Sequence, residues 1–143
     1  MKRQNISSGA VWESTIGYSR AVRVGNVVEV AGTTAMDGDQ VIGIGNAYEQ
    51  TRFILHKIEK ALQEAGATLQ QVVRTRIFVT DISQWEAVGR AHGESFSEIK
   101  PAATMVQVSA LIRPEQLVEI EATAIIEADD SLINSEAIPD VEV

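Results

Sequence analysis

Residues 72–79 restrict the fold of this chain most strongly, because the segment is short, rich in β-branched residues and flanked by two helical patterns. β-Branched side chains favour strands, so the segment is expected to form a strand rather than part of a longer helix. A strand between two helices in a short chain implies a layered fold, in which the helices pack on a sheet.

Helix boundary signals lie on either side of this strand. Asn46 precedes the first helix in a capping position, and Gly66 follows it with the freedom to adopt a left-handed backbone conformation. Ser83 and Glu86 have the spacing of a capping box at the start of the second helix. Pro101 ends this helix, because proline cannot continue the hydrogen-bond pattern.

Four further strands are expected around these elements. Residues 19–24 and 27–33 are rich in valine, and Gly25-Asn26 between them can supply the positive φ of a tight hairpin. Residues 103–108 and 117–126 form the last two strands. The prediction is an α+β fold of order β-β-α-β-α-β-β, with two helices packed on one face of a mixed sheet. The other face carries apolar residues, which self-association would cover.

One helix face and the tryptophans are expected to be packing surfaces. Trp85, Val88, His92 and Phe96 recur at helical spacing, so they are interpreted as one face of the second helix. Trp12 is likewise interpreted first as a packing residue.

The net charge of −8 comes mostly from the C-terminal end. Residues 127–143 contain six acidic residues and no lysine or arginine, which leaves about −2 for the rest of the chain. We therefore expect one folded domain over residues 1–126 and an acidic, flexible tail over residues 127–143. A docked tail strand is the alternative, since Leu132, Ile133 and Ile138 are apolar.

Several partners and cofactors are not expected. A nearly neutral body offers no basic track for nucleic acid, and no apolar run approaches the roughly 20 residues that span a bilayer. The polar residues after the first three do not resemble a signal peptide, so a cytoplasmic protein is expected.

The two histidines, His56 and His92, stand on different helices and predict no metal site. Gly43-Ile44-Gly45 lacks the lysine of a phosphate-binding loop and is interpreted as a turn.

Two pairs of charged residues share strand faces. Glu119 and Glu121 are two positions apart in the last strand, so their side chains leave the same face, and Arg74 and Arg76 do so in the strand of residues 72–79. Cross-strand or intersubunit ion pairs, or solvation, are the alternatives to a functional site for Glu121, Arg74 and Arg76.

Four short motifs occur in a specific order and spacing. They are Val24-Gly25-Asn26 with Ala31-Gly32, Ile77-Phe78-Val79-Thr80-Asp81, Lys100-Pro101-Ala102, and Val118-Glu119-Ile120-Glu121-Ala122. In this combination, residues 18–126 resemble the Rid family of reactive-intermediate deaminases, or YjgF-like proteins, also called endoribonuclease L-PSP. The resemblance implies a chorismate-mutase-like fold and a homotrimer with sites in the clefts between subunits.

The resemblance also implies an activity. Active members hydrolyse small 2-imino or enamino acids to 2-oxo acids and ammonia, with no cofactor or metal. An arginine holds the substrate carboxylate and a glutamate helps to position the attacking water.

Carried over by position, Glu119 is the expected catalytic residue. Residues expected to bind the substrate are Tyr18, Ala31, Gly32, Thr33, Gly89, His92 and Ala103. Ala103 stands where the family has its arginine, while Gly89 and His92 stand where the best-known members have asparagine and tyrosine. Losing a bidentate charged pair would weaken substrate binding by on the order of 10²-fold.

Another cation could replace the missing arginine, and the candidates are Arg20, Arg74, Arg76 and Arg90. Arg20 is two residues after Tyr18, which predicts that both side chains leave the strand on the same side. Three functions remain open: a deaminase-type hydrolase of altered specificity, a non-enzymatic trimeric protein that binds a small ligand, and, more distantly, an endoribonuclease.

Overall fold

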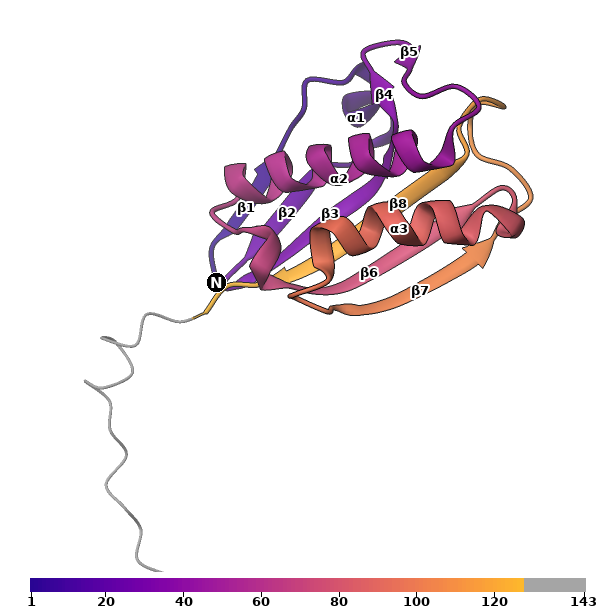
Figure 1. The fold of residues 1–143 in the computed structure, drawn as a ribbon. Coiled ribbons are helices and arrows are strands. Elements are labelled where there is room, and N and C mark those ends of the chain that lie inside the picture. The colour runs from indigo at the N-terminus through magenta and orange to yellow at the C-terminus, as the bar shows by residue number, and fades with distance from the viewer. Residues whose placement is uncertain (128–143) are drawn as a thin grey trace, which may run out of the picture.

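A six-stranded sheet covered on one face by two helices forms the body of the protein (Figure 1). The computed structural model describes residues 1–127, so the predicted tail lies outside the described residues except for Glu127. The strands of the main sheet are β1 (Arg3–Ile6), β2 (Ala21–Val24), β3 (Val27–Thr34), β6 (Val72–Val79), β7 (Ala102–Gln107) and β8 (Val118–Ile125). The covering helices are α2 (Ala47–Glu64) and α3 (Trp85–Phe96).

The strand order across the sheet is β1-β2-β3-β8-β6-β7. β6 and β7 are parallel, and all other neighbours are antiparallel. The mixed sheet, the α+β class and the predicted order of seven elements are therefore confirmed.

Six short elements were absent from the prediction. They are β1, α1 (Val11–Ile16), the small hairpin of β4 (Met36–Asp37) and β5 (Gln40–Val41), and the 3₁₀ turns η1 (Leu69–Gln71) and η2 (Ile82–Gln84). None of the helices within residues 1–127 has the length and apolarity needed to cross a membrane.

The hydrophobic core lies between the sheet and the two helices. Ile54, Ile58 and Leu62 of α2 are fully buried, and so are Val118 and Ile120 of β8. Burying one such side chain contributes about 1.5–3 kcal/mol to folding. Every second residue of β8 is buried, so Glu119, between Val118 and Ile120, points to the opposite face of the sheet, as the alternation predicts. That face is called the open face below.

Three predicted turn and cap residues behave as expected. The Asn46 side chain accepts a hydrogen bond from the Glu49 backbone N–H at 3.0 Å. Gly66 after α2 has φ +86°, in the left-handed region that favours glycine. Gly43 has φ +68°, which agrees with a turn rather than a phosphate-binding loop.

Two details of α3 were predicted wrongly. Asp81, not Ser83, provides the cap: its carboxylate accepts from the Ser83 N–H at 3.0 Å and begins the turn η2, while α3 itself has no side-chain cap. Trp85 is 55% exposed although Val88 and Phe96 on the same helix are buried. α3 begins at Trp85, directly after η2, so Trp85 occupies the first position of the helix, and the buried residues of α3 begin at Val88.

Replacing Asn46 with alanine should destabilise the protein by about 1 kcal/mol, because the cap acceptor of α2 is lost. Asn46→Asp retains an acceptor and adds a negative charge at the helix N-terminus, so it should be at least as stable as the unmodified protein. Urea unfolding at one fixed protein concentration measures both changes. Equal stability of the two variants would contradict the capping role.

Candidate functional site

The Glu119 carboxylate is held against the backbone of the neighbouring strand. Glu119 lies between Thr34 of β3 and Phe78 of β6. The register of β3 against β8 shifts between Val30 and Thr33, which bulges the chain at Gly32. A Cβ atom at Gly32 would overlap Oε1 of Glu119, so the glycine leaves the space that the carboxylate occupies.

Arg20 reaches the same backbone segment. Its Nη2 donates a hydrogen bond to the Gly32 carbonyl, and its backbone carbonyl accepts one from the Ala31 N–H at 3.0 Å. The guanidinium carbon lies 5.9 Å from the centre of the Tyr18 ring, so the two side chains share a side as predicted. Tyr18, Arg20, Ala31, Gly32 and Glu119 are called the Glu119 cluster below.

Burial and the opposite charges of Arg20 and Glu119 shift the pKa values of these two residues in opposite directions. Burial raises the pKa of Glu119, the positive charge of Arg20 lowers it, and Glu121 raises it further; the pKa is raised overall. Burial lowers the pKa of Arg20, while Tyr18, Glu13 and Glu119 act in the opposite direction. Arg20 is therefore within the electrostatic influence of two carboxylates, those of Glu13 and Glu119.

Thr33 belongs to the site only through its backbone. Its side chain is buried on the helix side of the sheet, in register with Ile120, and its Oγ1 donates to the Ala31 carbonyl at 2.8 Å. The hydroxyl is thus committed to holding the bulge of β3.

Ala103, His92 and Gly89 form a second group on the other side of the sheet. Ala103 lies beside buried Thr75 in the β6–β7 pair, and Thr75 Oγ1 is 2.9 Å from Nε2 of His92. Gly89 precedes His92 by three residues on α3. Burial lowers the pKa of His92, so its imidazole is neutral at pH 7. Thr75, Gly89, His92 and Ala103 are called the His92 group below.

The other three candidate arginines are engaged elsewhere. Arg74 donates to Thr104 Oγ1 at 2.6 Å, and Arg76 lies 3.5 Å from Glu121 in a cross-strand ion pair. The guanidinium of Arg90 lies 4.5 Å from the centre of the Tyr48 ring. The ion pair is one of the alternatives that the sequence left open, and of the four arginines only Arg20 is brought to Glu119.

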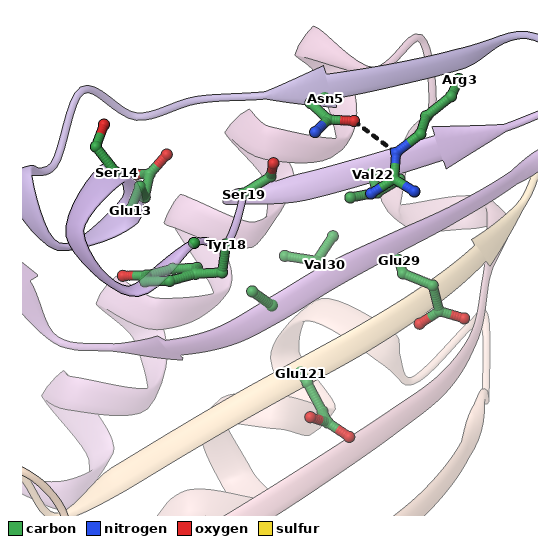
Figure 2. Close-up of a pocket in the computed structure, with 12 residues that line it drawn as sticks. Arg3, Asn5, Glu13, Ser14, Tyr18, Ser19, Val22, Glu29, Val30 and Glu121 are labelled. Carbon is green, nitrogen blue, oxygen red and sulfur yellow. Dashed lines mark hydrogen bonds between the residues drawn. The ribbon is translucent and has the colours of Figure 1, made fainter.

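A groove of about 620 Å³ on the open face borders the Glu119 cluster at Tyr18 and Ala31 (Figure 2). Glu13 of α1 lines it and is only 6% exposed, and Ser8 donates to its carboxylate through both the backbone N–H and the hydroxyl. The sequence gives no signal for this burial, since a glutamate among serines is usually solvated. Within residues 1–127, no three acidic or histidine side chains are grouped closely enough to hold a metal ion.

The chain is similar to proteins of known family. The family model described as Endoribonuclease L-PSP matches residues 10–126. An uncharacterised protein of Streptomyces coelicolor is 39% identical over 128 residues, which cover 90% of this chain and 96% of that protein. The 3-aminoacrylate deaminase RutC of Acinetobacter baylyi is 35% identical over 108 residues, covering 75% and 85%.

A solved structure of similar fold points to the same family. The crystal structure of Rv2704 from Mycobacterium tuberculosis, described as a member of the YjgF/YER057c/UK114 family, superposes with a TM-score of 0.78. It is 54% identical in sequence, and the match covers 87% of this chain and all of that one.

Replacing Gly32 with alanine should displace the Glu119 carboxylate towards solvent, because the new Cβ would occupy its place. The pKa of Glu119 should then fall towards its ordinary value, while the free energy of unfolding decreases by less than about 3 kcal/mol, since a flexible side chain can move. ¹³C NMR titration of the glutamate carboxyls, with Glu119→Gln for assignment, measures the pKa.

Gly93→Ala on α3 is the matched control, because nothing lies within 4 Å of a Cβ at that position. It should stabilise the protein by up to about 1 kcal/mol and leave the pKa of Glu119 unchanged. An unaltered Glu119 titration in Gly32→Ala would show that the two groups are not in contact.

Proposed function

Since the chain belongs to the Endoribonuclease L-PSP family, the Rid or YjgF family with its chorismate-mutase-like fold, we propose that it is a deaminase-type hydrolase of small imines or enamines. The reaction is the addition of water to a C=N bond, followed by loss of ammonia to give a carbonyl compound. The named relative RutC, a 3-aminoacrylate deaminase, supports this reaction class.

The observation that supports it best is the half-buried Glu119 carboxylate beside the Gly32 backbone. A carboxylate there accepts a hydrogen bond from water and removes a proton as the water oxygen attacks the imine carbon. Burial raises the pKa of Glu119, which makes its carboxylate a stronger base than that of a solvated glutamate. The proton then passes to the nitrogen, which leaves as ammonia when the C–N bond breaks.

The Glu119 cluster and the His92 group require two copies of the chain to form one site. They face opposite sides of the sheet, and β6 separates β7 from β8. In the proposed homotrimer, the Glu119 cluster of one subunit meets the His92 group of the next across a cleft. Tyr18 and the backbone of Ala31, Gly32 and Thr33 line one wall.

Ala103 favours a second candidate function, a non-enzymatic protein that binds a small ligand in the same clefts. An alanine gives a ligand contact surface but no charge to grip a carboxylate. Ligand binding would then depend on the shape of the cleft and on the backbone at Gly32 rather than on the chemistry of Glu119.

The deaminase proposal predicts that the purified protein accelerates carbonyl release from imines generated in situ, by an amino-acid oxidase for carboxylated imines and by an amine oxidase for neutral ones. Glu119→Gln should reduce kcat by about 10²-fold or more, because the general base is lost. Glu121→Gln is the matched control, two residues away on the same strand face, and should retain most of the activity. Release no faster than without protein, for both kinds of imine, would contradict the proposal.

The ligand-binding alternative makes a different prediction. A metabolite that binds the native protein should raise its melting temperature, by an amount that corresponds to about 2.7 kcal/mol at a hundred times the dissociation constant. In this case the shift should persist in Glu119→Gln, and no turnover should accompany it. Absence of any shift across a broad metabolite screen would argue against this function.

A further inference from the structure

Arg20 is the cation that faces Glu119, and its surroundings suggest what it does there. Resting on the function proposed above, we propose that Arg20 is a positioning residue for Glu119 rather than an anchor for a ligand carboxylate, and that the site takes imines without a carboxylate. Three observations support this: the hydrogen bond that the Arg20 side chain makes, the charges around it, and the composition of the opposite wall.

The guanidinium makes one hydrogen bond within residues 1–127, and its acceptor is the protein backbone. Nη2 donates to the Gly32 carbonyl, which lies in the bulge that the Glu119 carboxylate contacts. Nε is buried and donates to no group within residues 1–127. An anchoring arginine must instead turn two N–H groups towards the substrate as a planar fork. Arg20 holds the segment that shapes the Glu119 pocket, so its removal would disturb the orientation of the carboxylate.

The positive charge of Arg20 already interacts with carboxylates of the protein. Glu13 and Glu119 both interact with it, and Glu121 adds a further negative charge near Glu119, although it is paired with Arg76. A substrate carboxylate would therefore be a third negative group around one arginine. Like charges in a partly desolvated site repel strongly, so this arrangement disfavours anions.

Lys57 is a second cation near Arg20, and its ammonium is hydrogen-bonded to the backbone. Its ammonium donates to the carbonyls of Thr34 and Met36, both at 3.0 Å. Burial lowers the pKa of Lys57, Arg20 lowers it further, and Asp37 opposes them. The ammonium thus fixes the end of β3 directly after the bulge, and none of the observed contacts directs it towards a ligand.

The His92 group, which forms the proposed opposite wall, carries no positive charge. Ala103 is uncharged, and the His92 imidazole is neutral because burial lowers its pKa. His92 lies against Thr75, and its ring centre is 4.6 Å from that of Phe96, with the two rings tilted. An uncharged imine of an aldehyde or simple ketone matches both walls, and its hydrolysis gives the carbonyl compound and ammonia with no further reactant.

Substrate pairs test the two roles of Arg20 directly. The native protein should hydrolyse a neutral imine at least about 10-fold more efficiently, in kcat/KM, than a carboxylated imine of similar size. Arg20→Met should reduce kcat on the neutral imine by on the order of 10²-fold through misplacement of Glu119, with little change in KM. Arg20→Lys, which keeps the charge, should recover part of this loss. A rise in KM confined to the carboxylated imine would instead identify Arg20 as an anchor and overturn the inference.

Direct titration of Glu119 separates this inference from the proposed function. Arg20 lowers the pKa of Glu119, so Arg20→Met should raise that pKa and move the acidic limb of the rate profile to higher pH. An unchanged Glu119 titration would overturn the inference even in an active enzyme. A raised pKa in a protein that hydrolyses no imine would support the positioning role and refute the proposed function. If Arg20→Met does not fold, Arg20→Lys and the substrate preference of the native protein still decide between the two roles.

Discussion

The contact between the Glu119 carboxylate and the Gly32 backbone is the constraint on which the candidate site depends. It requires two neighbouring strands, a register shift in β3 and a residue without a side chain at the shift. At the same shift, the Gly32 carbonyl accepts a hydrogen bond from Arg20. Arg20 and the Glu119 carboxylate therefore both contact the backbone at Gly32. A regular β3–β8 ladder would direct a side chain into this space and would leave Glu119 as an ordinary solvated residue of the open face.

The architecture could be predicted because it follows from local patterns. Alternation in β8 assigns Glu119 and Glu121 to one face, and Asn46 and Gly66 mark the ends of α2 by their own chemistry. β1 and α1 could not be predicted in this way, because they are short, mostly exposed and follow neither strand nor helix periodicity. They are ordered by tertiary contacts, such as the pairing of β1 with β2 and the buried carboxylate of Glu13.

The site was predictable only in part, because it too depends on tertiary contacts that local patterns do not reveal. The family resemblance points to Glu119 and its wall residues, but four arginines were candidates for the missing cation, and spacing could place Arg20 only on the side of Tyr18. The choice among them depends on cross-strand register: Arg76 opposes Glu121, whereas Arg20 lies beside the bulge in β3. Neither register nor bulge can be read from a local pattern. Likewise, the hydroxyl of Thr33 is part of the core because the bulge turns it to the helix side.

The charges on the two walls of the proposed cleft both disfavour an anionic ligand. An exposed site could tolerate an unmatched charge, because water screens it. In the Glu119 cluster, burial raises the pKa of Glu119 and lowers that of Arg20, and the charge of each residue opposes this shift in the other, so the two charges stabilise each other. Ala103 and a neutral His92 would offer an anionic ligand no positive charge on the other wall. The alanine at position 103 and the carboxylates around Arg20 therefore favour the same class of uncharged substrate.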